Sequence, residues 1–162
     1  MISLIKKLLS KSKLPRDEYP VSVHGFSAKN IDKNALKVLK KLDESGCDAY
    51  LVGGVIRDYL SGIPSKDCDV VTSAKPKKIT SVIKNSIMIG KRFRIVHARF
   101  GREYVEVSTF RAQHSNKKRF VSQEGIVRRD NVYGTIDDDV MRRDFTVNAL
   151  YYRFKDQMIL DF

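Results

Sequence analysis

The sequence predicts a mixed α/β (α+β) fold, with a small mixed sheet that carries helices on one side. Apolar residues recur at helical spacing between residues 31 and 44. Strand-like and helix-like segments then alternate up to residue 84. Beyond residue 86 short apolar runs follow one another, separated by turn residues, as in a β-meander.

The first thirty residues are predicted to be a basic N-terminal arm and lead-in to a domain that spans 31–162. Residues 1–13 mix apolar side chains with four lysines. They read either as a solvated arm or as an amphipathic helix that touches a partner or a membrane surface. Residues 14–30 hold two prolines and a glycine and are expected to be extended. No stretch suffices to span a bilayer, so stable membrane insertion is not expected.

The next elements follow in order. A helix is predicted over 31–44, and Gly46 ends it. A strand over 47–52 leads to a turn at Gly53-Gly54 and a short helix over 55–60. The strand predicted over 67–72 is followed by a helix that Pro76 opens and that runs to about residue 84.

The second half is predicted to be mostly strands. The apolar runs are 87–89, 93–100 and 104–110, and Gly101-Arg102 indicates a hairpin between the last two. Residues 111–138 are polar and predict a long loop. A helix is expected over 139–149, and a final hairpin pairs 150–154 with 158–162.

The composition favours a polyanionic partner. The 162 residues include 31 Lys and Arg against 19 Asp and Glu, a net charge of +12. Such a surplus favours nucleic acid or nucleotide, although it also fits a basic domain whose charge only aids solubility. The two cysteines, Cys47 and Cys68, have no metal-ligand spacing and predict a reducing, cytoplasmic location.

Two carboxylates stand two residues apart in the predicted strand 67–72. Asp67 and Asp69 therefore project from the same face of that strand. Glu106 lies among valines in the run 104–110, where a carboxylate is costly to bury unless it is paired or binds metal. If the two strands are neighbours, the three acids converge and predict a Mg²⁺ site. Otherwise Glu106 faces solvent and Asp67 and Asp69 are an ordinary solvated pair.

The diglycine turn directly precedes this acidic pair. Gly53 and Gly54 let backbone N–H groups approach phosphate oxygens at the start of the following helix. The pattern matches neither the Rossmann fingerprint nor the P-loop. Arg57, just inside the helix, can reach a phosphate or hold a carboxylate, whereas Asp58 can cap or pair. A plain tight turn is the alternative.

A second cluster occupies Arg142–Leu150. On the helix predicted there, Asp144 and Asn148 are four residues apart and share a face, with Arg143 close by. That face suits a ribose and a triphosphate. The alternative is an ordinary charged helix with Phe145 and Leu150 in the core.

Together these residues resemble the head domain of the class II nucleotidyltransferases, which comprise bacterial poly(A) polymerases and tRNA CCA-adding enzymes. The first motif matches in Leu51–Gly54, Arg57-Asp58, Gly62 and the Asp67/Asp69 pair, and the second matches from Arg142 to Leu150. Ile89–Arg94 is more similar to the poly(A) polymerase version than to the CCA-adding one.

The resemblance implies a polymerase β-like nucleotidyltransferase palm with a five-stranded sheet. It implies that Asp67, Asp69 and Glu106 bind the catalytic metals, and that Asp144 contacts a ribose hydroxyl or belongs to the active-site acids. It also implies a triphosphate-binding role for Arg111, Arg143 and Asn148. Val55 is larger than the residue usual there, and the neck, body and tail regions of the family do not follow within the 162 residues.

The function expected from the resemblance is transfer of AMP from ATP to an RNA 3′ end, that is, polyadenylation. Basic residues of the long loop are candidates for the RNA backbone, with a solvated loop as the alternative: Lys117, Lys118, Arg119, Arg128 and Arg129. CCA addition to tRNA is the alternative activity. An inactive domain that binds nucleotide or RNA without turnover is the alternative of another class.

Overall fold

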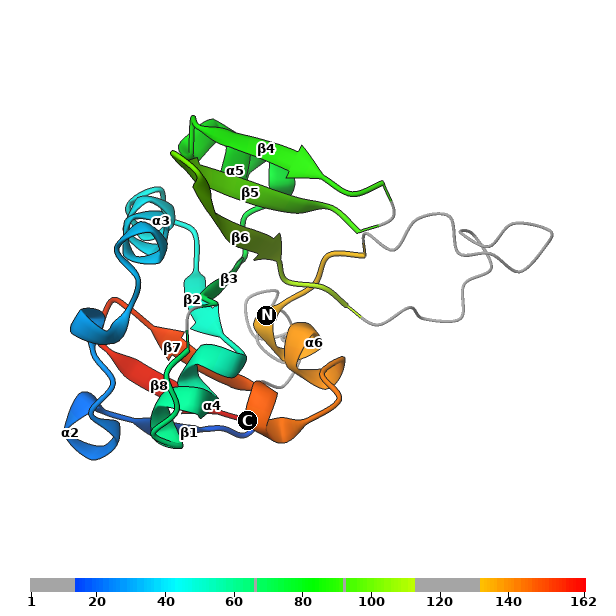
Figure 1. Cartoon of the computed structure of the whole chain (residues 1–162). Coiled ribbons are helices and arrows are strands. Elements are labelled where there is room, and N and C mark those ends of the chain that lie inside the picture. Colours follow the sequence, from blue (N-terminus) through cyan, green and yellow to red (C-terminus); the bar gives the residue numbers. More distant parts are fainter. Residues whose placement is uncertain (1–13, 66, 92, 113–131) are drawn as a thin grey trace, which may run out of the picture.

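A computed structural model of the chain describes residues 14–65, 67–91, 93–112 and 132–162 (Figure 1). One mixed sheet of eight strands runs through these residues in the order β1-β8-β7-β2-β3-β6-β5-β4. Neighbouring strands are antiparallel except for the parallel pair β3 and β6. The strands are β1 Asp17–Tyr19, β2 Ala49–Val52, β3 Asp69–Thr72, β4 Ser86–Ile89, β5 Ile95–Phe100, β6 Glu103–Thr109, β7 Leu150–Arg153 and β8 Met158–Asp161.

The mixed α/β class is confirmed, but the sheet has eight strands rather than five. One added strand, β1, comes from the segment that was expected to be an extended lead-in, and it pairs antiparallel with β8. All three residues of β1 are exposed, so no apolar pattern marks the strand in the sequence. Phe26, from the same segment, is only 1% exposed and belongs to the main core.

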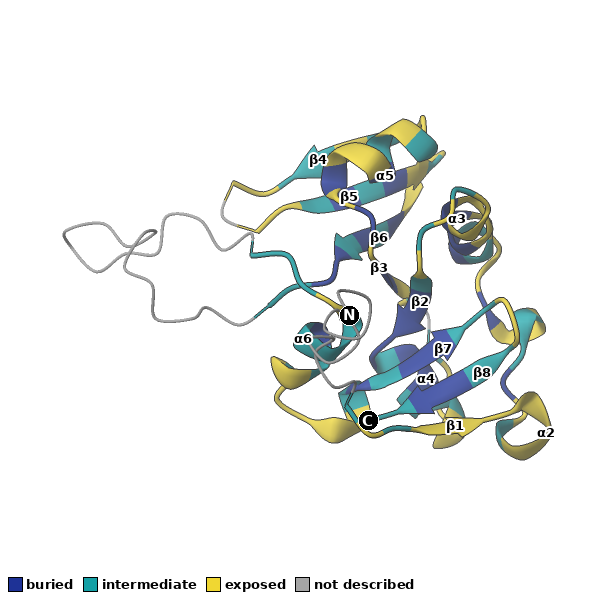
Figure 2. Cartoon of the chain, turned by 180° about the vertical axis from the view of Figure 1, so that it is seen from behind, coloured by how far each residue is buried: buried dark blue, intermediate teal, exposed yellow. Residues whose placement is uncertain are grey.

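Short helices cover both faces of the sheet, where one face was expected (Figure 2). Apolar residues of α3, α4 and α5 join the main core, whereas Ile136 and Val140 of α6 pack on a smaller cluster around Tyr151. We call the side of the sheet that carries this smaller cluster the α6 face. The helices are α2 Val21–His24, α3 Lys33–Glu44, α4 Gly54–Leu60, α5 Pro76–Val82 and α6 Ile136–Met141, with 3₁₀ turns η1 Ala28–Asn30 and η3 Thr146–Asn148.

Helix α3 illustrates how the sequence determines a local element. Asp32 caps its N-terminus by accepting hydrogen bonds from the backbone N–H groups of Asn34 and Ala35, at 2.8 and 3.0 Å. Its apolar positions Ala35, Val38, Leu39 and Leu42 are all buried. The predicted helix was thus correct in place and in buried face.

The helix predicted over 139–149 is wrong. Helix α6 begins after a capping box between Thr135 and Asp138 and ends at Met141. The chain then bends, and only the 3₁₀ turn η3 follows before β7. The bend brings Arg142 and Arg143 back onto Asp139, and the β-branched Thr146 and Val147 add little helix propensity.

Elsewhere the predicted boundaries shift by a few residues. Strand β3 starts at Asp69, so Asp67 precedes the strand instead of belonging to it. The hairpin at Gly101-Arg102 forms between β5 and β6 as predicted, and β7 and β8 form the final hairpin. Within the described part of the chain, no helix combines the length and apolar character needed to cross a membrane.

Candidate active site

Asp69 lies at the centre of the sheet, at the first position of β3. It pairs with Val52 of β2, and Val52 pairs on its other side with Tyr151 of β7. Residues that face each other on paired strands project from the same side of a sheet. Val52 and Tyr151 are buried on the α6 face, so Asp69 belongs to that face, where it is exposed.

Glu106 lies beside Asp69 on the neighbouring strand. The parallel register pairs Val70 with Val107, so the preceding residues of the two strands, Asp69 and Glu106, are adjacent. Val70 and Val107 are buried in the main core. Because side chains alternate along a strand, Asp69 and Glu106 both project toward the opposite, α6 face. The predicted convergence of these two carboxylates is therefore a feature of the sheet.

The charged side chains around Asp69 shift its pKa. Desolvation raises the pKa of Asp69, and the negative charges of Glu106 and Asp67 raise it further, while Arg143 opposes the shift. Glu106 also contacts His97, whose Nε2 lies 3.3 Å from Oε1 of the carboxylate. The carboxylates thus repel one another, and a divalent cation would relieve that repulsion.

Asp67, Asp69 and Glu106 line one cavity of about 920 Å³, whose lining also includes the acids Asp32 and Glu103 and the side chains of Arg102 and Tyr104. Across the described residues, no three His, Cys, Asp or Glu side chains are close enough together to hold a single metal ion. The donor chemistry nevertheless fits Mg²⁺, because carboxylate oxygens are the ligands that this ion takes. The sheet brings Asp69 and Glu106 together, and Asp67 reaches the same cavity from the segment before β3.

The diglycine bend directly follows the residue that pairs with Asp69. Gly53 has φ +80° and ψ −138°, a conformation that essentially only glycine adopts. Gly54 opens α4, and a Cβ added there would lie 3.2 Å from Nη2 of Arg57. The bend is therefore placed next to the acids, as predicted.

Arg57 joins the two sequence motifs. Its Nη1 donates a 2.8 Å hydrogen bond to Oδ1 of Asn148, and its Nε donates a 2.8 Å bond to Asp58. Nη2 lies 2.7 Å from the same Asp58 oxygen. Arg57 and Asn148 thus hold α4 against η3, and their side chains are engaged with each other.

A buried carboxylate that the sequence interpretation missed organises the second motif. Asp139 is fully buried and accepts hydrogen bonds from Arg142 Nε at 2.8 Å, Arg143 Nη2 at 3.0 Å and Tyr151 Oη at 2.7 Å. The backbone N–H of Arg111 also donates to it, at 3.2 Å. The signal was present in the sequence, because Arg142 and Arg143 stand three and four residues after Asp139.

This network fixes Arg143. Its Nε donates to Tyr151 Oη at 2.8 Å, and its guanidinium lies 5.2 Å from the centre of the Tyr151 ring. Burial raises the pKa of Asp139, but the charges and hydrogen bonds of Arg142 and Arg143 outweigh it and hold that pKa below its usual value. Because Tyr151 is buried on the α6 face, Arg143 lies on that face too, and its charge opposes the rise in the pKa of Asp69.

Asp144 does not share a helical face with Asn148, contrary to the prediction, because it lies in the bend between α6 and η3. Its side chain is exposed. Arg111 follows β6 and pairs with Tyr133 in an isolated bridge, and its guanidinium lies 5.3 Å from the Phe93 ring centre. The loop residues predicted to bind RNA, Lys117, Lys118, Arg119, Arg128 and Arg129, lie outside the described residues.

Solved structures with a similar fold include CCA-adding enzymes. A CCA-adding enzyme in an apo form matches with a TM-score of 0.66 at 24% identity, covering 90% of this chain and 35% of that one. The CCA-adding enzyme of Bacillus stearothermophilus in complex with CTP matches with a TM-score of 0.60 at 29% identity, covering 81% and 30%.

Curated relatives are more similar in sequence. Poly(A) polymerase I of Haemophilus influenzae is 48% identical over 142 residues, which cover 85% of this chain and 31% of the relative. Poly(A) polymerase I of Salmonella typhimurium is 44% identical over 154 residues, covering 92% and 32%. A CCA-adding enzyme of Staphylococcus aureus is 35% identical over 124 residues, covering 75% and 29%. The chain thus spans about a third of the length of each.

The family model described as the poly A polymerase head domain matches residues 49–162. That range includes β2 to β8, the diglycine bend, the three carboxylates and the Asp139 network. The chain belongs to the poly A polymerase head-domain family.

Proposed function

We propose that this domain catalyses template-independent transfer of AMP from ATP to RNA 3′ ends in the cytoplasm, with Mg²⁺ as cofactor. The observation that supports it most directly is the adjacency of Asp69 and Glu106 on the α6 face, beside the diglycine bend. The identity of 44–48% with two bacterial poly(A) polymerases I favours adenylate addition over other nucleotidyl transfers.

Asp67, Asp69 and Glu106 are the residues that would hold Mg²⁺. When bound, the ion lowers the pKa of the attacking sugar hydroxyl and neutralises charge on the phosphates. Asp69 is the central member, because it adjoins Glu106 in the sheet and stands two residues after Asp67 in the chain. The mutual repulsion of these carboxylates in the free protein favours binding of a cation between them.

The triphosphate would bind on the positive side of this cluster. The backbone N–H groups of Gly53 and Gly54 would meet phosphate oxygens at the end of β2, and Arg143 lies on the same α6 face as Asp69. Arg57 and Asn148, which bind each other, would align α4 and η3 around the nucleotide.

Two further residues remain candidates from the family resemblance. Asp144 is exposed in the bend before η3, where it is accessible to a ribose hydroxyl. Arg111 would reach the phosphates from the end of β6. The basic loop residues at 117–119 and 128–129 are proposed to contact the RNA backbone.

CCA addition is the second candidate, and the 35% identity to a Staphylococcus aureus CCA-adding enzyme favours it. A third is nucleotide or RNA binding without turnover, since the chain spans about a third of its relatives. An end-labelled RNA incubated with Mg²⁺ and each nucleotide separately distinguishes the three. Runs of A made from ATP alone support adenylate addition, and a short product that needs CTP and then ATP supports CCA addition. No product with nucleotide binding retained supports the third.

A further inference from the structure

Positive charge is concentrated in one stretch of the chain. Residues 70–102 contain nine Lys and Arg and no Asp or Glu. The remaining 129 residues hold 22 basic and 19 acidic side chains, so this stretch accounts for +9 of the net charge of +12. An ordinary solvated surface alternates both signs, and an acid-free stretch of this length therefore indicates a contact with a polyanion.

The acid-free stretch forms one end of the molecule. It begins in β3, in the middle of the sheet, and includes all of α5, β4 and β5, which lie together beside β6 at the top of Figure 1. The described basic residues that are exposed there are Lys75, Lys77, Lys78, Lys84, Lys91, Arg94, Arg99 and Arg102. We call this end of the molecule the basic lobe.

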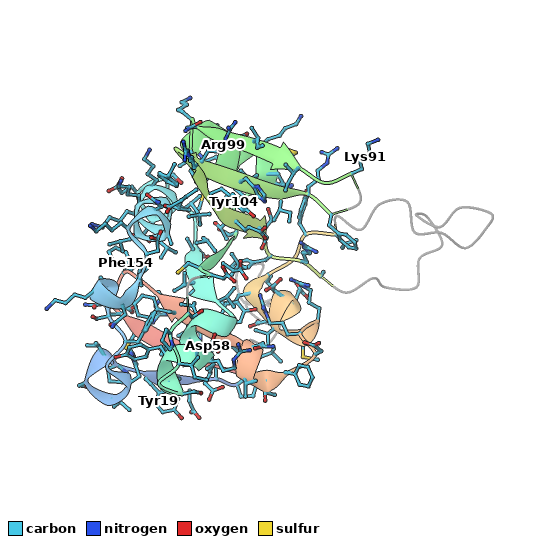
Figure 3. All side chains as sticks on the ribbon, in the orientation of Figure 1. Tyr19, Asp58, Lys91, Arg99, Tyr104 and Phe154 are labelled. Carbon is cyan, nitrogen blue, oxygen red and sulfur yellow. The ribbon has the colours of Figure 1, made fainter. Side chains whose placement is uncertain are left out.

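The two faces of the basic lobe differ. Val96 and Ala98 of β5 and Val105 of β6 are buried in the main core, to which α5 contributes Ile79. The residues that alternate with them, Arg99 and Tyr104, project from the other face, which continues the α6 face. Tyr104 is 56% exposed there, and Figure 3 labels both side chains.

A ring platform lies on this exposed face. The Tyr104 and His97 rings stack with centroids 4.1 Å apart and an interplanar angle of 8°. Arg99 pairs with Tyr104 in the antiparallel register, so a cation adjoins the exposed ring. An exposed aromatic ring next to a guanidinium is the combination that binds an unpaired base and its phosphate.

The platform leads directly to the carboxylates. His97 pairs with Glu106 in the next register position, and Glu106 adjoins Asp69. Tyr104 and Arg102 line the same cavity of about 920 Å³ as Asp69 and Glu106. A strand bound over Tyr104 would therefore present its end to the proposed active site.

We propose that the exposed face of the basic lobe binds the 3′ segment of single-stranded RNA, with an unpaired base stacked on Tyr104 and phosphates held by Arg99 and Arg102. The assignment deepens the proposed transferase function, on which it rests. It selects a single strand because a base within a duplex has no free face for the Tyr104 ring.

Binding is measured by fluorescence anisotropy of a labelled oligo(A) RNA, in EDTA and without nucleotide. Tyr104→Ala is expected to weaken binding roughly 5- to 150-fold, the range for loss of one stacked base, and Tyr104→Phe to restore it. Arg99→Glu is expected to weaken binding and to reduce the slope of log K against log salt by about 0.7.

Matched controls carry the same changes on other surfaces. Tyr19→Ala removes a tyrosine that is 39% exposed on β1, at the opposite edge of the sheet. Lys41→Glu reverses an exposed charge on α3. Both are expected to bind oligo(A) as the wild type does. Equal losses in the controls, or wild-type affinity in both Tyr104→Ala and Arg99→Glu, would overturn the proposal, as would tighter binding to duplex RNA.

The binding assay uses neither metal nor ATP, so it separates this proposal from the proposed reaction. If the domain binds oligo(A) through Tyr104 and Arg99 but makes no product, the proposed RNA-binding surface is supported and the proposed transferase function is contradicted. If the Tyr104→Ala variant extends RNA with the kinetics of the wild type, the proposed transferase function is supported and the proposed RNA-binding surface is contradicted.

Discussion

Arg57 donates a 2.8 Å hydrogen bond to the side-chain oxygen of Asn148, a residue ninety-one positions further along the chain. The bond joins the helix that follows the diglycine bend to the turn that precedes β7. Two motifs that are separate in the sequence are thus one structure around Asp69.

The Arg57–Asn148 bond should be measurable as a coupling. Arg57→Ala and Asn148→Ala are each expected to weaken ATP binding, because α4 and η3 lose their alignment. In a double-mutant cycle on the free energy of unfolding, the two side chains should be coupled by about 1 kcal/mol. The expected coupling is smaller than for a fully buried hydrogen bond, because Arg57 is partly exposed. Arg57→Ala combined with Lys155→Ala, a change at an exposed residue in the turn between β7 and β8, should be additive. A coupling of zero for the first pair would show that the bond does not form in solution.

Asp69→Ala is expected to abolish transfer to RNA while the fold is kept, because Asp69 is exposed and its side chain fills no part of the core. Removing it also relieves repulsion with Glu106 and Asp67, so the variant should be at least as stable as the wild type at pH 7. Activity is followed by primer extension and stability by urea unfolding. Asp17→Ala, an exposed acid on β1, should retain activity. Turnover by Asp69→Ala at the wild-type rate would disprove the assignment of Asp69 to the metal.

Asp139→Asn is expected to destabilise the protein by about 3–5 kcal/mol at pH 7, because Arg143 is left beside a neutral partner in a buried site. The folded state lowers the pKa of Asp139 below the ordinary value of 3.8. Its contribution is therefore fully present above that pH and is lost as the pH falls through the folded-state pKa.

Urea unfolding at pH values from 7 down to 3 tests this prediction. The difference between the wild type and Asp139→Asn should stay constant above pH 5 and shrink at the acid end. Asp43→Asn, an exposed change on α3, should shift stability by less than about 0.5 kcal/mol. A difference that grows with acid would have the wrong sign for a lowered pKa.

The two glycines of the bend should respond differently to alanine. Gly53→Ala places a side chain at φ +80°, so we expect it to cost about 1–3 kcal/mol of stability. Gly54 has no positive φ, but the added Cβ would lie 3.2 Å from Arg57 Nη2. Gly54→Ala should displace Arg57 and so weaken ATP binding. The helix propensity that alanine gains should offset the lost Arg57 contact, so that stability changes little. Thermal unfolding measures the change in stability, and nucleotide titration measures the change in ATP affinity. Equal losses of stability in Gly53→Ala and Gly54→Ala would contradict the prediction.

Much of the fold was predictable because its signals are local. The apolar period of α3, the cap at Asp32 and the glycines after β2 depend on residues within a turn or two of each other. The acidic residues could also be identified from local sequence. Asp67 and Asp69 are two residues apart, and Glu106 is a carboxylate among valines, which is unusual in any strand.

The sequence alone predicted α3, the strands on either side of the diglycine bend and the two hairpins, and it proposed Asp67, Asp69 and Glu106 as the acids of the site. Only the tertiary structure decided that Asp69 lies beside Glu106, that β1 extends the sheet, and that the second motif bends around Asp139 instead of forming a helix. The physical reason is that strand order and register arise from backbone pairing and burial between distant segments. A hydrogen bond such as Arg57–Asn148 joins residues ninety-one positions apart, and no short window of sequence contains both partners.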